Sequence, residues 1–259
     1  ENWLLEIAYP PLDRITVYLV DLDGNSVTYR GGDKYPFDKR AIKHRNVMFK
    51  VPVAVGQNVR VYVRVKTDGS LQLPLVLRSP DALLTKDHEE QAILGVFYGI
   101  LIAMLLYNLL IFASIRDINY LNYVWYIMGW IMFQMSINGL AFEYLWPDNP
   151  AWANKSIPFS IGFALLGVIL FSRGFLQVPQ LLPRVDRIFK AFGFLTVVVM
   201  LIALFGSYNL SIKLGSAATI FICSMIVGVG AWCMYLGARQ ARYFMVAWTA
   251  LLMGTVVYA

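Results

Sequence analysis

The chain of 259 residues is 58% hydrophobic and only 15% charged, whereas soluble domains carry about 25% charged residues. This composition excludes an ordinary soluble protein. The net charge of +6 comes mostly from cations that lie between apolar segments after residue 90, where they meet anionic lipid headgroups rather than nucleic acid. We therefore expect membrane lipid as a partner, and no nucleic acid.

Residues 1–86 show the alternation of apolar and polar side chains that is typical of strands with one buried face. Strands are predicted at Trp3–Tyr9, Ile15–Val20, Ser26–Tyr29, Val47–Ala54, Asn58–Lys66 and Leu71–Arg78. The last two are predicted to pair as an antiparallel hairpin across Thr67–Ser70 and to bury their alternating valines and leucines. Short strands without a helix signal predict an antiparallel β-sandwich or jelly roll, truncated because the chain opens inside a strand.

Aromatic and charged residues of this module form a candidate ligand-binding site, which comprises Trp3, Asp33, Tyr35 and Arg40. Aromatic rings stack on the apolar faces of sugars while charged groups hold their hydroxyls, so a carbohydrate or another small molecule is the expected ligand. In the alternative interpretation, Asp33 and Arg40 pair to hold a loop and Trp3 belongs to the core.

The sequence does not indicate metal or catalytic chemistry. His44 and His88 stand apart from any Cys or acidic cluster at ligand spacing, and Asp21–Asn25 fits a turn better than a calcium loop. Cys223 and Cys233 lie too far apart along one apolar segment to form a disulfide. We predict no metal, no cofactor, no catalytic residue and no enzyme activity in this part of the protein.

Six apolar runs follow, beginning with the uncharged stretch Gln91–Ser114, which as a helix crosses a hydrocarbon core of about 30 Å. The runs are residues 91–114, 119–139, 156–172, 191–206, 212–236 and 243–259. They predict a polytopic helical bundle over residues 87–259, incomplete at its C-terminus, and hence an α + β membrane protein. Asp81–Glu90 is predicted to be a short charged linker between the two domains.

Cations in the loops indicate the orientation of the bundle. With the β-module outside, the cytoplasmic loops hold seven, which are Arg116, Arg173, Arg184, Arg187, Lys190, Arg239 and Arg242. The opposite loops hold only Lys155 and Lys213, so the positive-inside bias predicts an external N-terminal module. The cytoplasmic cations are also candidate contacts for an output module, notably those around Asp186, where the alternative is an anchor to anionic lipid.

Small residues recur at four-residue spacing on the first apolar run. Gly95, Gly99 and Ala103 form a stripe that lets helix backbones approach closely, and Tyr107 continues it. The stripe fits helix packing inside the bundle or, alternatively, the seam of a homodimer. Because no run carries a charge deep in its middle, the pattern weighs against an ion-coupled transporter.

The order of several motifs resembles the seven-transmembrane receptors with diverse intracellular signalling modules (7TMR-DISM), a bacterial family. The resemblance rests on GVFYGILIAMLLYNLLIFASIRDINYLNYVWY, then Gly139, EYLWP and FSRGFLQVPQLLPRVDR. Earlier in the chain, LEIAYPPLDRITVYLVDLDG, GGDKYPF and the basic run to Phe49 look like the outer domain of the family, which is of jelly-roll, carbohydrate-binding-like type. Together the two resemblances cover nearly the whole chain.

The resemblance implies a receptor in the bacterial inner membrane with a periplasmic N-terminal domain. Such a receptor senses a periplasmic ligand and signals through seven helices to a cytoplasmic output module in cis, which is a diguanylate cyclase, a histidine kinase or a phosphatase. About six of the seven spans are expected here, and catalytic activity is expected only in the output module. The alternatives are a transporter or channel subunit and a membrane-anchored protein-binding module.

Overall fold

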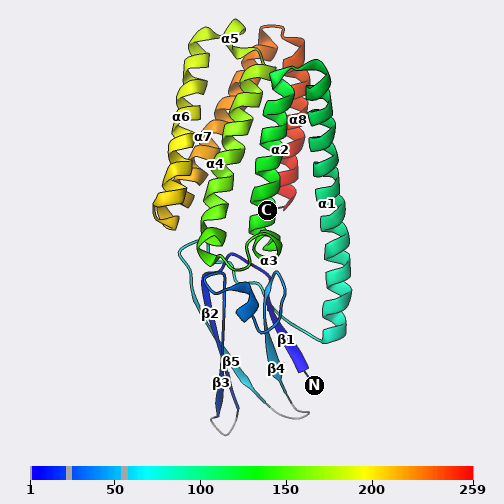
Figure 1. Cartoon of the computed structure of the whole chain (residues 1–259), viewed down its shortest axis with the longest axis vertical. Coiled ribbons are helices and arrows are strands. Elements are labelled where there is room, and N and C mark those ends of the chain that lie inside the picture. Colours follow the sequence, from blue (N-terminus) through cyan, green and yellow to red (C-terminus); the bar gives the residue numbers. More distant parts are fainter. Residues whose placement is uncertain (1, 22–24, 54–57, 259) are drawn as a thin grey trace. The chain divides into compact units, whose positions relative to one another are not determined.

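The computed structural model describes residues 2–21, 25–53 and 58–258 (Figure 1). The strands are β1 (Asn2–Ile7), β2 (Arg14–Val20), β3 (Ser26–Gly31), β4 (Val47–Pro52), β5 (Arg60–Lys66) and β6 (Leu75–Arg78), with a 3-10 turn, η1, at Phe37–Lys39. The helices are α1 (Pro80–Ile115), α2 (Ile118–Ile137), α3 (Leu140–Tyr144), α4 (Pro150–Phe175), α5 (Val178–Leu181), α6 (Pro183–Phe205), α7 (Tyr208–Tyr235) and α8 (Arg239–Tyr258). The predicted α + β class is confirmed. The middle of the predicted Asp21–Asn25 turn lies outside the described residues.

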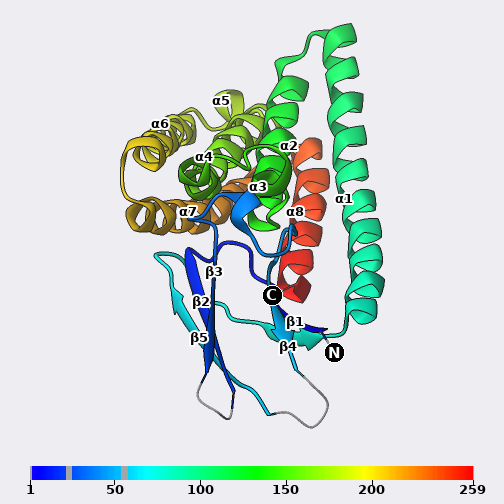
Figure 2. The ribbon, with the colours of Figure 1, turned by 60° about the horizontal axis from the view of Figure 1, so that its bottom comes forward.

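The six strands form two antiparallel sheets, with the strand orders β4-β1-β6 and β3-β2-β5. Figure 2 shows β2, β3 and β5 grouped apart from β1 and β4. Each strand turns every second side chain inward, and the two inner faces share one apolar core. Ile7 of β1 and Val17 of β2 are fully buried in it. Phe49 of β4 lies against Tyr29 of β3, with 6.2 Å between ring centroids. The N-terminal module is therefore a β-sandwich, as predicted.

The predicted hairpin between the last two strands is wrong. β5 pairs with β2 and β6 pairs with β1, so the segment between them crosses from one sheet to the other. Val63 lies opposite Val17, and Leu77 lies opposite Leu5, so both strands do turn apolar side chains toward the core. Both are edge strands, however, and Leu77 stays 52% exposed. Alternation identifies the apolar face of a strand but not its partner.

The six predicted apolar runs each overlap a long helix, and these helices are α1, α2, α4, α6, α7 and α8. Four of them, α1, α4, α6 and α7, are long and apolar enough to cross a membrane. α1 begins at Pro80, a residue suited to the first turn of a helix, so the predicted linker Asp81–Glu90 is helical. Only Ser79 separates β6 from this helix.

The chain divides into two compact units. The first comprises Glu1–Ile102 and Ile131–Ile157, and the second comprises Ala103–Trp130 and Pro158–Ala259. Residues of the β-sandwich thus share a unit with the start of α1, with α3 and with the start of α4. The predicted domain limits, 1–86 and 87–259, stay a prediction.

Within the second unit, α2 and α4 approach to backbone contact through glycines. A Cβ built at Gly129 on α2 would lie 2.7 Å from the Cα of Ala164 on α4. One built at Gly167 on α4 would lie 2.7 Å from the Cα of Tyr126 on α2. Inside a membrane the hydrophobic effect does not drive helices together. Small residues at such crossings allow close van der Waals contact, which stabilises the helix pair instead.

We expect Gly129→Ala to destabilise the protein, because the added methyl group collides with backbone atoms that cannot rotate away. Overpacking of this kind costs about 1–3 kcal/mol. The matched control is Gly228→Ala on α7, where no atom of the described residues lies within 4 Å of the added Cβ and alanine favours the helix by up to about 1 kcal/mol. Thermal unfolding in detergent measures both. Equal melting temperatures for the two variants would contradict close α2–α4 packing.

Candidate functional site

A buried carboxylate lies where the β-sandwich meets the first helix. Glu6 of β1 has no exposed surface. Its oxygens accept hydrogen bonds from Asn46 Nδ2 at 2.7 Å, Arg78 Nε at 2.9 Å and Lys86 Nζ at 2.5 Å. These donors come from the approach to β4, from the end of β6 and from α1. A buried charge is tolerated only with such partners, so Glu6 holds three elements in one geometry.

The ion pairs continue along α1. Lys86 also pairs with Glu90 one turn later at 3.3 Å, and Glu90 pairs with Arg45 of the β-module. Burial raises the pKa of Glu6, but the hydrogen bonds from Lys86, Arg78 and Asn46 outweigh it and leave the pKa below its usual value. The carboxylate is therefore ionised at neutral pH. We call Glu6, Lys86, Glu90 and Arg45 the α1 junction.

A second contact involves Asp33, which follows β3. The preceding Gly32 has φ 124°, and a Cβ there would lie 2.3 Å from the carbonyl oxygen of Asp13, so the turn requires glycine. Asp33 is buried, and Asn154 Nδ2 of α4 donates to its Oδ1 at 3.1 Å. Burial, with the negative charge of Asp13, raises the pKa of Asp33 to about 7 despite opposing contributions from Asn154, Arg40 and Lys34.

Arg40, which follows η1, lies beside two aromatic rings. Its guanidinium carbon is 4.8 Å from the ring centroid of Phe37 and 5.3 Å from that of Phe142 on α3, a cation–π arrangement. Its Nη1 donates to the carbonyl oxygens of His44 and Arg45 at 2.7 and 2.9 Å, while its buried Nε has no hydrogen-bond partner among the described residues. Burial lowers the pKa of Arg40 to about 10.

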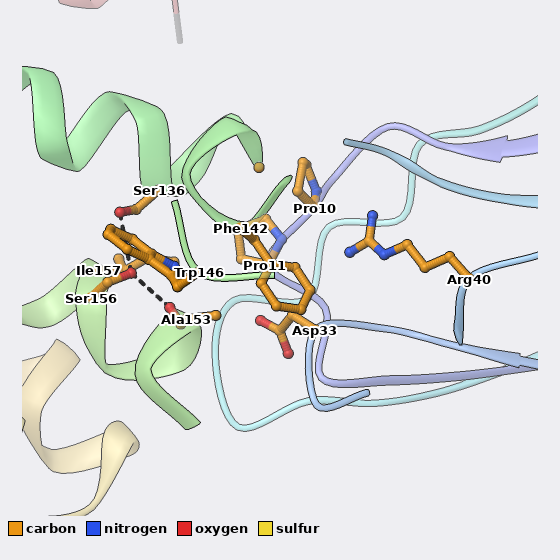
Figure 3. Close-up of a pocket in the computed structure, with 11 residues that line it drawn as sticks. Pro10, Pro11, Asp33, Arg40, Ser136, Phe142, Trp146, Ala153, Ser156 and Ile157 are labelled. Carbon is orange, nitrogen blue, oxygen red and sulfur yellow. Dashed lines mark hydrogen bonds between the residues drawn. The ribbon is translucent and has the colours of Figure 1, made fainter. Parts of the chain in front are cut away.

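Asp33 and Arg40 line one small cavity together with Pro11, Phe142 and Trp146 (Figure 3). Its volume of about 10 Å³ holds no more than about one water molecule. The cavity is therefore a packed contact of β-module loops with α3 and α4. We call it the α3–α4 junction.

The four candidate ligand-binding residues from the sequence lie in different surroundings. Asp33 and Arg40 both line the α3–α4 junction, and Tyr35 is half-buried in the connecting loop. Trp3 lies on β1 and packs against the sandwich core. Sequence reasoning missed Glu6 and Asn154. Glu6 occupies a position on β1 that alternation assigns to solvent.

Asp186, near the start of α6, accepts a hydrogen bond from Nε of Arg173, near the end of α4. Asp186 also pairs with Lys190, one turn further along α6, at 2.9 Å. Arg173 and Asp186 thus join the end of α4 to the start of α6 within the second unit. The other predicted cytoplasmic cations are exposed, namely Arg116, Arg184, Arg187, Arg239 and Arg242.

The small-residue stripe of α1 lies open. No described atom is within 4 Å of a Cβ built at Gly95 or at Gly99, and Tyr107 is exposed. Helix packing through this stripe stays a prediction. Among the described residues, no three His, Cys, Asp or Glu side chains gather in a way that could hold a metal ion.

A β-sandwich joined by ion pairs to helices that are long and apolar enough to cross a membrane defines a multi-pass membrane protein with a folded N-terminal domain. Family comparison agrees with this class. The family described as 7TM diverse intracellular signalling matches residues 90–259, and the domain described as 7TMR-DISM extracellular 2 matches residues 1–79. The chain therefore belongs to the 7TMR-DISM family, whose two matched domains are sensory rather than catalytic. Searches of curated proteins and of solved structures found no match.

The raised pKa of Asp33 predicts a pH-dependent stability. Between its ordinary pKa of 3.8 and the folded value of about 7, the folded chain keeps a proton that the unfolded chain has lost. The free energy of unfolding therefore falls as the pH rises through this window, by up to about 4 kcal/mol, and levels off above it.

Asp33→Asn mimics the protonated carboxyl and should abolish this slope. Thermal unfolding in detergent at pH values from about 5 to 8 measures this slope. The wild-type chain is a suitable comparison because both proteins contain the same histidines, so any histidine contribution to the slope is the same in both. We expect the variant to melt above the wild type at the high end of the range and near it at the low end. Parallel curves would show that Asp33 does not titrate in this window.

Proposed function

We propose that the chain is the sensing and membrane-spanning part of a receptor in a bacterial inner membrane. Its β-module binds a periplasmic small molecule or carbohydrate, and its helices transmit the bound state to a cytoplasmic output module in cis. That module is a diguanylate cyclase, a histidine kinase or a phosphatase. Membership of the family supports a receptor, and the excess of cations in alternate loops supports the periplasmic orientation of the β-module.

The observation that carries the proposal is the α1 junction. A receptor of this type needs at least two helix arrangements whose populations the ligand changes. Separating β1 from α1 would remove Lys86 from the buried carboxylate of Glu6 and leave it only Asn46 and Arg78 as partners, and removing one partner of a buried ion pair is strongly destabilising. The sandwich and the outer turns of α1 therefore move together, which is what transmission requires.

The α3–α4 junction provides a second attachment. Arg40 packs on Phe142 of α3, and Asp33 accepts the hydrogen bond of Asn154 on α4. We propose that Asp33 and Arg40 act here as attachment residues. A ligand-binding role for them together with Trp3 and Tyr35 stays a prediction.

Glu6→Gln tests the coupling. The neutral amide weakens the interactions with Lys86 and Arg78, so we expect faster hydrogen exchange of the backbone amides of residues 80–90 in the full chain. Glu89→Gln, an exposed change on the same helix, is the matched control and should leave exchange unchanged. If exchange in Glu6→Gln equals that of the control, the β-module does not restrain α1 and the transmission mechanism fails.

Exposed apolar side chains on two edge strands, one in each sheet, favour a protein-binding module as a second candidate function. Val61 on β5 and Leu75 and Leu77 on β6 turn toward the core but are 40%, 43% and 52% exposed. Leu71 and Leu73, between the two strands, are exposed as well. Open edge strands with uncovered apolar side chains can accept a strand from another polypeptide.

A photo-reactive amino acid at Leu77 tests this second function in cells. We expect a discrete cross-linked polypeptide from this position. The same group at Tyr62, which is exposed on the outer face of β5, should give none. Identical products from both positions, or none from Leu77, would contradict strand addition at this edge.

A further inference from the structure

We propose that a second cavity of the first unit binds a small primary amine. It has a volume of about 270 Å³ and lies between the segment before β4, α1 and α3. Ligand pockets span about 300–1,000 Å³, so this cavity fits a small metabolite rather than an oligosaccharide. The residues that give it chemical character are His44, Arg45, Asp87, Tyr98, Glu143 and Tyr144.

The charges that line the cavity favour a cation. Asp87 and Glu143 contribute two carboxylates, whereas the one permanent cation, Arg45, is already paired with Glu90. The buried Oδ1 of Asp87 accepts no hydrogen bond from the described residues, although His44 Nε2 lies 3.3 Å away. The backbone amide of Asn46 donates to His44 Nδ1 at 3.0 Å, so Nε2 is the ring nitrogen that faces Asp87. An ammonium group adds a charged donor to this carboxylate and balances its charge.

The uncharged part of the cavity wall fits a short apolar group attached to the ammonium. Leu94 and Leu140 line it together with two tyrosines, whose rings attract a cation by the same cation–π interaction that holds Arg40. The hydroxyl of Tyr98 accepts a hydrogen bond from Asn138 at 3.1 Å, which fixes this ring. Gly95 leaves the α1 side of the cavity open, since in the described part of the chain no atom lies within 4 Å of a Cβ built there.

The position of the cavity connects it to signalling. Asp87 lies on α1 between Lys86 and Glu90 of the α1 junction, and Arg45 belongs to both the junction and the cavity wall. A bound ammonium therefore acts on the charges that attach the β-module to the first helix. A regulatory role for the amine rests on the proposed receptor function, whereas the binding site itself does not.

Three probes of similar size and different charge test the site: phenethylamine, 2-phenylethanol and 3-phenylpropionate. Calorimetry on the full chain in maltoside detergent, which carries no amine, should show binding of the amine and at least about tenfold weaker binding of the alcohol and the acid. Equal affinities for the three probes would overturn the proposal, because charge would then play no part.

Two substitutions locate the binding. Gly95→Leu fills the cavity and should abolish amine binding, while Gly99→Leu, one turn further on the same helix and equally open, should leave it unchanged. Asp87→Asn should weaken binding at least about tenfold without loss of folding. Unchanged affinity in Gly95→Leu would overturn the site. Equal loss in both leucine variants would place binding elsewhere on the helix and would overturn it too.

Competition with a lipid shows whether the natural ligand is a free amine or the amine of a lipid headgroup. Competition from added phosphatidylethanolamine would assign the site to a lipid headgroup, whereas its failure to compete would assign it to a free amine; either result keeps the amine chemistry. Hydrogen exchange of residues 80–90 with and without phenethylamine separates the site from its role. Binding without a change in exchange would leave the site intact and remove its regulatory role.

Discussion

A single buried carboxylate constrains how the β-sandwich joins the membrane helices. Glu6 lies on the face of β1 that points away from the sandwich core, yet it has no exposed surface. Taking this charge out of water is tolerated only because Asn46, Arg78 and Lys86 converge on its two oxygens. Each donor comes from a different element, so the position of α1 against the sandwich follows from the need to keep all three.

The two junctions differ in the interactions that they use. The α1 junction consists of ion pairs, which hold a defined distance and direction. The α3–α4 junction consists mainly of packed rings around Arg40 and a neutral amide on Asp33, whose protonation changes near neutral pH. The β-sandwich is thus joined to the start of α1 by ion pairs and to α3 and the start of α4 by aromatic packing and one hydrogen bond.

The helices obey different packing rules from the sandwich. In the sandwich, buried Ile7, Val17 and Phe49 fill the space between two sheets. Between α2 and α4 the important feature is the missing side chain, since Gly129 and Gly167 let backbones touch. Lipid is as apolar as the helix surface, so close van der Waals contact replaces the hydrophobic effect as the cause of association.

The sequence alone determined which segments are strands and which are apolar helices, because period-2 alternation and long uncharged runs are local properties. It also predicted where the cations lie relative to those runs. Only the tertiary structure decided that β5 and β6 belong to different sheets, since alternation indicates which face of a strand is buried but not which strand it pairs with. It likewise decided that Glu6 is buried, and that Asp33 lies against Asn154. Burial and pKa depend on neighbours that are distant in sequence, and the fold alone brings these neighbours together.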